Sequence, residues 1–195
     1  MDDVGAADVG FSYRQHHPQD EHERQPIRTP HIDRLAQDAV RLSHYYVHPV
    51  CTPSRAALLT GRYSSSAALP GVIIGTNTHG LNDSHATIAQ AFRSDGYATH
   101  MVGKWHLGFS KPKYTPLHKG FDTFLGLYNG AFSYYSKRAG PLEDLTNGTT
   151  PFWTDRHATP LFADEAIRLI QADHAANKCV PTLVRFRSFY GSFLH

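Results

Sequence analysis

Apolar residues recur at the three- and four-residue spacing of an amphipathic helix in several parts of the chain. In the first of these parts, apolar residues follow Ile32 at i+3, i+4, i+7 and i+8. Thr29 precedes Pro30 there; threonine favours the N-cap, and the first helical turn tolerates proline. Such patterns predict helices after Thr29-Pro30, after Thr52-Pro53, from Asp83 or Ser84 up to Gly96, and over 161–174.

Short apolar runs lie between these helices and predict strands over 42–47, over 97–102 and within 180–189. Helices that alternate with short strands predict an α/β fold in which a mixed, largely parallel sheet lies between helices. Residues 14–25 carry no apolar side chain and predict a solvated polar loop. Residues 110–158 mix aromatic, glycine and lysine residues without a clear period, so we expect little regular structure there.

The length of 195 residues suits one domain, or one domain with part of another. The chain has 19 basic and 17 acidic residues, and its net charge of +2 does not suggest a nucleic-acid partner. No apolar run reaches about 18 residues, so the sequence predicts no membrane span. The opening Met1-Asp2-Asp3 does not resemble a signal peptide, and Cys51 and Cys179 cannot build a disulfide framework.

The segment Cys51-Thr52-Pro53-Ser54-Arg55 combines a thiol, a helix start and a cation. Because Cys51 precedes a predicted helix, free N–H groups and the positive end of the helix dipole face whatever Cys51 holds. Arg55 lies one turn into that helix, where its charge can neutralise an anion. This arrangement suits a nucleophile that attacks an anionic ester. The position of Cys51 alone is also compatible with a buried, inert cysteine.

The run from Cys51 to Gly61 resembles the sulfatase signature Cys-x-Pro-Ser-Arg-x-x-x-Leu-Thr-Gly and matches every specified position. In that family, a dedicated enzyme reads the Cys, Pro and Arg and oxidises the cysteine to Cα-formylglycine. The resemblance therefore implies a formylglycine at Cys51, stabilised by Arg55. One hydroxyl of the hydrated aldehyde attacks sulfur, and the other expels sulfate as the aldehyde re-forms. A plain cysteine or serine lacks the second hydroxyl and would be trapped as a covalent sulfate.

A second segment, Gly103-Lys104-Trp105-His106-Leu107-Gly108, resembles the second signature of the same family. Lys104 and His106 are two residues apart, so they point to the same side of an extended segment. The resemblance implies that both bind the sulfate oxygens and act beside the formylglycine hydroxyl. On spacing alone, a lysine and a histidine two residues apart also fit a solvated loop.

The start of the chain resembles the metal-binding loop of the family. Asp2-Asp3-Val4-Gly5 is similar to the family's Asp-Asp-x-Gly loop, and Asp8-Val9-Gly10-Phe11 continues the similarity. Adjacent carboxylates on a flexible turn suit a hard cation, here Ca²⁺ in preference to Mg²⁺. The resemblance implies Asp2, Asp3 and Cys51 as ligands of an ion that polarises the sulfate. An Asp-Asp pair near a terminus also fits a solvated turn.

The similarity extends to about residue 178, and it is strongest with the arylsulfatase B group and its arylsulfatase I and J relatives. The segments Gly120 to Phe124 and Tyr134 to Ser136 carry that part of the resemblance. It implies an alkaline-phosphatase-like fold and a sulfuric ester hydrolase acting on an aryl sulfate or a sulfated amino sugar. The implied partners are a sulfated glycosaminoglycan and the formylglycine-generating enzyme, and the implied location is lysosomal or secreted.

The sequence departs from the family pattern at both ends. The family's first core strand, its Asp-Asn metal pair and its downstream active-site lysine have no counterpart here. Over 180–195, arginines interrupt the expected strand, and His195 is an out-of-register candidate for the family's sulfate-binding histidine. We therefore expect residues 1–195 to be a partial N-terminal catalytic domain. The alternatives to a sulfuric ester hydrolase are a phosphate or phosphonate ester hydrolase of the same fold and a non-catalytic truncated fragment.

Two further features bear on modification and charge. Asn147-Gly148-Thr149 fits the N-glycosylation sequon and lies in a loop-like segment, and Asn82-Asp83-Ser84 fits it too. Basic residues that follow the second signature could attract an anionic sugar sulfate or belong to a solvated loop. They are Lys111, Lys113, His118 and Lys119.

Overall fold

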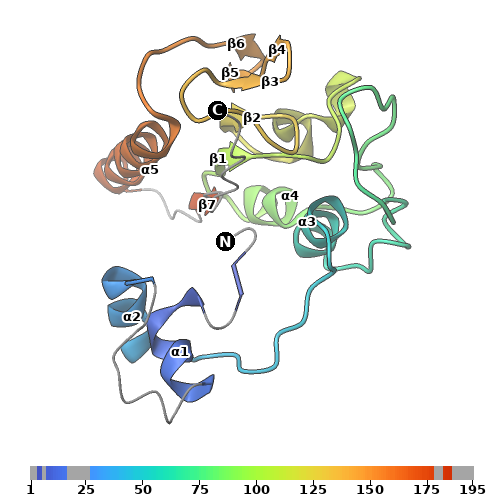
Figure 1. Cartoon of the computed structure of the whole chain (residues 1–195). Helices are drawn as coiled ribbons and strands as arrows, with labels where there is room; N and C mark the ends of the chain where they lie inside the picture. Colours follow the sequence, from blue (N-terminus) through green and yellow to red (C-terminus); the bar gives the residue numbers. More distant parts are fainter. Residues whose placement is uncertain (1–3, 6–7, 17–26, 178–181, 186–195) are drawn as a thin grey trace. The chain divides into compact units, whose positions relative to one another are not determined.

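The computed structural model describes residues 4–5, 8–16, 27–177 and 182–185 (Figure 1). The chain divides into two compact units, Met1–Val47 with Ser188–His195, and His48–Arg187. Within the described ranges, no helix is both long and apolar enough to cross a membrane.

The first unit contains two short helices, α1 (Gly10–His16) and α2 (Pro30–Gln37). Thr29 accepts a hydrogen bond from the N–H of Gly10 at 2.8 Å, and Asp33 accepts one from the N–H of Phe11 at 3.0 Å. The first N–H groups of a helix have no partner within the helix, and these two side chains accept their hydrogen bonds at the start of α1. The helix predicted after Thr29-Pro30 is confirmed. Thr29 occupies the N-cap position as expected, but its hydroxyl donates to the Asp33 carboxylate and makes no capping bond to a backbone N–H of α2.

Two predictions for this part of the chain are corrected. Helix α1 occupies 10–16, so the start of the predicted polar loop over 14–25 is helical, while 17–26 lie outside the described residues. The strand predicted over 42–47 is wrong, since these residues form only turns and irregular backbone. Leu42, Tyr46 and Val47 are largely exposed, so this apolar run gains no burial within the described structure.

The second unit is built on a five-stranded mixed sheet of order β6-β5-β2-β1-β7 (Figure 1). Strands β1 (His100–Lys104), β2 (Thr123–Leu127) and β7 (Thr182–Arg185) are parallel, with β1 in the centre. Strands β5 (Leu145–Asn147) and β6 (Thr150–Pro151) continue the sheet in antiparallel fashion. This architecture confirms the predicted α/β class with a mixed sheet.

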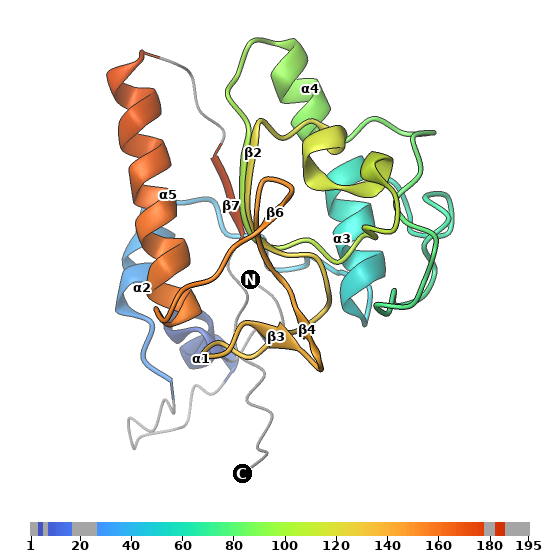
Figure 2. The same cartoon turned by 90° about the horizontal axis from the view of Figure 1, so that it is seen from above.

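Alternate side chains of the central strands enter two different cores. Met101 of β1 and Phe124 of β2 pack with residues of α3 (Cys51–Thr60) and α4 (Ile88–Ser94). The next residue of each strand, Val102 and Leu125, packs with α5 (Ala158–Ala175). Figure 2 shows α5 on one face of the sheet and α3 and α4 on the other. Burial on both faces explains why adjacent residues of these strands are apolar, as in Met101-Val102 of β1 and Phe124-Leu125 of β2.

Helix α5 is fastened to the sheet by a buried polar chain. Nε2 of His100 lies 2.7 Å from the Asp173 carboxylate, and Nδ1 of the same ring lies 2.7 Å from the Thr123 hydroxyl. His100 and Asp173 are both buried, so the pair joins the starts of β1 and β2 to the last turn of α5. The helix predicted over 161–174 is confirmed, and as α5 it extends further at both ends, from Ala158 to Ala175.

Helix α4 begins later than the sequence suggested. Its cap is Thr87, not Asp83 or Ser84: the Thr87 hydroxyl accepts the N–H of Gln90, and the Gln90 side chain accepts the N–H of Thr87. This reciprocal capping box satisfies two amides at once. Gly96, with φ of +85°, takes the position after the helix that was predicted for it.

Residues 110–158 contain more regular structure than predicted. They hold β2, β5, β6 and a small hairpin of β3 (Arg138–Ala139) and β4 (Leu142–Glu143). Two short 3₁₀ helices, Pro112–Tyr114 and Pro116–Lys119, lie between β1 and β2. The expectation of little regular structure in this range is therefore wrong.

Candidate active site

The helix predicted next to the first signature is confirmed as α3, but it begins at Cys51 itself, whereas the sequence placed Cys51 before the helix. Val50 is extended with φ of −132° and ψ of 159°, and the first helical hydrogen bond runs from the N–H of Ser54 to the carbonyl oxygen of Val50 at 3.2 Å. Pro53 lies in the first turn, where a missing N–H costs no helical hydrogen bond. Cys51 is half-buried and forms no disulfide. Because it is the first residue of α3, it lies at the positive end of the helix dipole.

Two buried side chains of α3 bind the backbone of the second signature. Nε of Arg55 donates to the carbonyl oxygen of Trp105 at 2.7 Å, and the Thr52 hydroxyl donates to that of His106 at 3.1 Å. The Thr52 hydroxyl also accepts the N–H of Ile73 at 3.2 Å. These bonds hold the two signatures together, although about 50 residues separate them in sequence. Thr52 occupies an unspecified position of the signature, so the sequence did not indicate its role.

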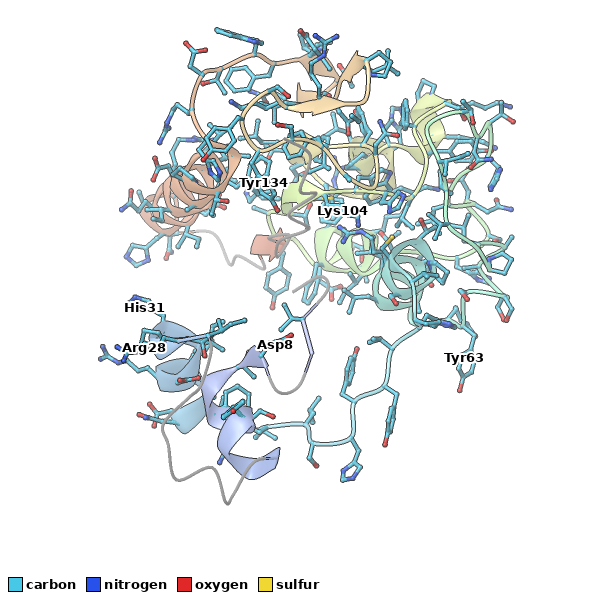
Figure 3. The ribbon with its side chains drawn as sticks, viewed as in Figure 1. Asp8, Arg28, His31, Tyr63, Lys104 and Tyr134 are labelled. Carbon is cyan, nitrogen blue, oxygen red and sulfur yellow. The ribbon has the colours of Figure 1, made fainter. Side chains whose placement is uncertain are left out.

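Lys104 and Arg55 place two buried cations on neighbouring elements. Lys104 is the last residue of β1 and is labelled in Figure 3. Lys104 and Arg55 are each only 2% exposed. Both side chains are therefore largely removed from water at a point where side chains of α3 donate hydrogen bonds to the backbone just after β1. Positive charge in such a setting acts on an anion more strongly than it would at the surface.

His106 is held from several directions. Its ring Nε2 lies 2.7 Å from the carbonyl oxygen of Ile73, and because a carbonyl only accepts, Nε2 carries the proton. Its backbone N–H donates to the carbonyl oxygen of Tyr128 at 3.0 Å. Its φ of +59° is unusual for a residue with a side chain. Because β1 ends at Lys104 and His106 is left-handed, the premise of a continuous extended segment is wrong here.

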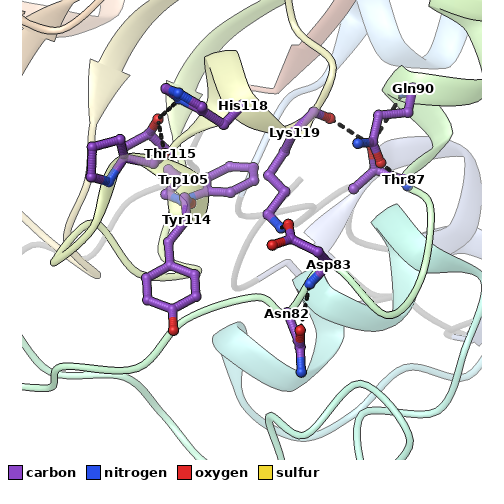
Figure 4. A network of polar contacts seen from close by, with 10 residues as sticks. Asn82, Asp83, Thr87, Gln90, Trp105, Tyr114, Thr115, His118 and Lys119 are labelled. Atoms are coloured by element: carbon purple, nitrogen blue, oxygen red, sulfur yellow. Dashed lines mark hydrogen bonds and ion pairs between the residues drawn. The ribbon is translucent and has the colours of Figure 1, made fainter.

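Trp105, between the two signature residues, is completely buried. Its indole N–H donates to the carbonyl oxygens of Gly108 at 2.8 Å and Tyr114 at 2.9 Å. Figure 4 labels Trp105 and Tyr114. Its ring meets Phe121 edge to face. The tryptophan thus anchors the second signature to the segment that precedes β2.

Lys119, one of the basic residues considered for attracting a substrate, has a structural role. Its ammonium is 1% exposed and pairs with the Asp83 carboxylate, as Figure 4 shows. This hydrogen bond lowers the pKa of Asp83. The Lys119 carbonyl oxygen accepts the Thr87 hydroxyl at 2.6 Å, which links it to the cap of α4. Lys119 is therefore not a surface cation that could attract a sugar sulfate.

Several predicted residues lie outside the described part of the chain. These are Asp2 and Asp3, proposed as metal ligands, together with Cys179 and His195. Among the described residues, no three His, Cys, Asp or Glu side chains gather as a metal site would require. Asn147, the predicted glycosylation site, ends β5 and is exposed.

Comparison with known proteins decides the family of this chain. The family model described as Sulfatase matches residues 1–180. The chain belongs to the sulfatase family. The resemblance read from the two signatures is thereby confirmed.

Curated sulfatases match the chain at similar levels. Mouse arylsulfatase J is 43% identical over 136 residues, which cover 69% of this chain and 21% of that protein. Human arylsulfatase A is 40% identical over 149 residues, covering 74% of this chain and 26% of that protein. Arylsulfatase J belongs to the subgroup that the sequence pattern indicated. The chain spans about a fifth to a quarter of the length of these sulfatases.

Solved structures confirm the alkaline-phosphatase-like sulfatase fold. The crystal structure of Ps i-CgsB has a TM-score of 0.78 and 27% identity, covering all of this chain and 44% of that one. The sulfatase PsFucS1 from Pseudoalteromonas sp. has a TM-score of 0.76, with 22% identity over 98% of this chain and 43% of that one.

Proposed function

We propose that this sulfatase-family chain contributes the nucleophile and the sulfate-binding groups of a sulfuric ester hydrolase. The observation that carries the proposal is the bonding of the Cys51 helix to the second signature. Arg55 binds the Trp105 carbonyl oxygen and Thr52 binds that of His106, so the first turn of α3 faces the segment bearing Lys104. The helix start and the buried cations together form an environment suited to an anionic ester.

Each residue has a proposed role in that reaction. Cys51, converted to formylglycine, supplies the attacking hydroxyl and the group that later releases sulfate. Arg55 stabilises this residue electrostatically from the next turn of the same helix. Lys104 binds sulfate oxygens with its ammonium, and His106 binds sulfate through its imidazole, whose orientation is set by the Ile73 carbonyl oxygen. Charge stabilisation by fixed groups of this kind lowers the barrier to reaction.

A calcium ion, with Asp2, Asp3 and the modified Cys51 as ligands, belongs to the proposal on the strength of the sequence resemblance. The described residues do not by themselves form a site for it, since they hold no cluster of three ligating side chains. No step of the proposed reaction is therefore assigned to the ion. His195 likewise keeps its proposed role as a sulfate-binding residue only from the sequence.

The proposed substrate is an aryl sulfate or a sulfated amino sugar, such as the 4-sulfate of N-acetylgalactosamine in a glycosaminoglycan. Two similarities support this class: the curated matches include arylsulfatases, and Ps i-CgsB is known in complex with k-i-k-neocarrahexaose. That complex has a TM-score of 0.77 and 29% identity over 94% of this chain and 42% of that one. We propose the formylglycine-generating enzyme as partner and a lysosomal or secreted location.

The test is expression of the full-length protein together with the formylglycine-generating enzyme. Mass analysis of the peptide that bears Cys51 should show the aldehyde in place of the thiol. The protein should then hydrolyse an aryl sulfate, and the Cys51→Ala variant should not. An unmodified thiol with no hydrolysis would overturn the proposal, and faster hydrolysis of a matched aryl phosphate would reassign the reaction to phosphate esters.

A further inference from the structure

The turn that follows β2 closes against His106. The carbonyl oxygen of Tyr128 accepts the N–H of His106 at 3.0 Å. Two residues later, Gly130 lies directly against the imidazole: a Cβ at Gly130 would be 2.5 Å from Cε1 and 2.7 Å from Nε2 of His106. No real Cβ approaches so closely, so only glycine allows the ring its present position.

A buried carboxylate holds this turn. Asp144 is 4% exposed and accepts hydrogen bonds from the N–H of Tyr128 at 3.1 Å, the N–H of Asn129 at 2.9 Å and the Nδ2 of Asn129 at 3.0 Å. Hydrogen bonds to an ionised acceptor are stronger than neutral ones. Burial raises the pKa of the Asp144 carboxyl, which these donors oppose. Removing the carboxylate would thus release the backbone of 128–129.

The backbone of Asp144 is itself held in place. The backbone N–H of Asp144 donates to the carbonyl oxygen of Lys137 at 3.1 Å. The next residue, Leu145, begins β5 and pairs with Leu127 of β2. The turn is therefore fixed on one side by the sheet and on the other by the Asp144 side chain. His106 is the functional residue that this turn touches, through both its backbone and its ring.

We propose that Asp144 is a positioning residue: it fixes the turn over 128–130, and this turn holds the His106 imidazole in the orientation that sulfate binding needs. The inference rests on the proposed function for the role of His106. It goes beyond that function by assigning specific positioning roles to Asp144 and Gly130, neither of which is part of a signature. A purely structural role would make Asp144 matter for folding and leave the imidazole unchanged.

The decisive experiment observes His106 directly in the full-length protein. With ¹³C-labelled histidine, the Cε1 resonance of His106 is assigned by its loss in His106→Ala. We expect this resonance to shift in Asp144→Asn, to shift less in Asn129→Ala, which removes one of three hydrogen bonds, and to shift in Gly130→Ala. Gly71→Ala is the matched control, because a Cβ at Gly71 meets nothing within 4 Å.

An unchanged His106 resonance in folded Asp144→Asn, or in Asn129→Ala should the first variant not fold, would overturn the positioning role. This readout needs no activity, so it stands even if the protein hydrolyses no sulfate ester. Where hydrolysis is measured, Asp144→Asn should lower kcat/KM by up to about 100-fold, the cost of a small misplacement of a reacting group. The same substitution should cost much less in the His106→Ala background, and an equal loss in both backgrounds would contradict the proposal.

Discussion

Nε of Arg55 donates a hydrogen bond to the backbone carbonyl oxygen of Trp105 at 2.7 Å, and both residues are buried. The bond joins the helix that starts at Cys51 to the segment between Lys104 and His106. The Arg55 side chain thus supplies charge to the proposed site and also fixes the position of α3 relative to the second signature. Because a guanidinium offers donors in a fixed planar fork, lysine cannot reproduce this geometry.

We therefore expect Arg55→Lys to weaken the site even though it keeps the charge. The lost buried hydrogen bond should lower the free energy of unfolding by about 1–3 kcal/mol. Urea unfolding measures this effect, and kcat/KM should be expressed per formylglycine-bearing molecule, since the arginine is also part of the modification signature. Arg62→Lys, an exposed position just after the same helix, is the control. Wild-type stability and turnover in Arg55→Lys would contradict this role.

The buried carboxylate of Asp144 predicts a pH effect on stability. Burial raises its pKa in the folded state above the unfolded value, which is about 3.9. The folded protein then binds a proton more readily than the unfolded chain. The contribution of the protonated Asp144 carboxyl to the free energy of unfolding is complete below its pKa in the unfolded chain. This contribution is lost as the pH rises through its pKa in the folded protein.

Asp144→Asn removes this titration. The difference in unfolding free energy between the wild type and Asp144→Asn should therefore move in favour of the wild type as the pH falls from about 7 to about 4. Urea unfolding of both proteins across this range measures it. A constant difference, or one that moves the other way, would show that the Asp144 pKa is not raised.

Two aspartates on α5 allow a matched test of burial. Asp173 is buried against His100, whereas Asp164 pairs with Arg156 at the surface, with both side chains more than half exposed. Asp173→Asn should lower the free energy of unfolding by about 1–3 kcal/mol, because a buried hydrogen bond is impaired. Asp164→Asn should cost at most about 1 kcal/mol. Equal costs in thermal unfolding would contradict the anchoring of α5 through His100.

The two signatures and the helices α2, α3, α4 and α5 could be predicted from sequence, because each depends on local pattern. Strand β2 was missed, and Gly126 is the physical reason. Gly126 pairs with Gly103 of β1, and a Cβ at Gly126 would lie 1.8 Å from the Gly103 carbonyl oxygen. A glycine that looks like a strand breaker in the sequence is therefore what lets these two strands approach.

Other features depend on residues far apart in the chain. Helix α1 is capped by Thr29 and Asp33, which follow Gly10 and Phe11 by 19 and 22 positions, so no local capping signal marks it. Asp144 acts on a turn 15 to 16 residues earlier. The left-handed backbone of His106 has no sequence signal either, because non-glycine residues adopt it only where the surroundings impose it.

Asn147 provides a test of the proposed secretory route. It is exposed at the end of β5, and Gly148 turns the chain into β6 with φ of +63° and donates its N–H to the Phe124 carbonyl oxygen at 2.7 Å. The acceptor therefore lies on an exposed hairpin turn, which suits N-glycosylation. Full-length protein secreted from eukaryotic cells should carry a glycan at Asn147, detected by glycosidase treatment and peptide mass analysis.

The third position of the sequon supplies a pair of variants that leave the turn glycine in place. Thr149→Ala removes the hydroxyl that the sequon requires, and Thr149→Ser keeps one. The glycan at Asn147 should be absent in the first variant and present in the second, while peptide analysis distinguishes it from any glycan at Asn82. A bare Asn147 in the secreted wild-type protein would contradict the prediction, because the asparagine and Thr149 are both exposed in the structure.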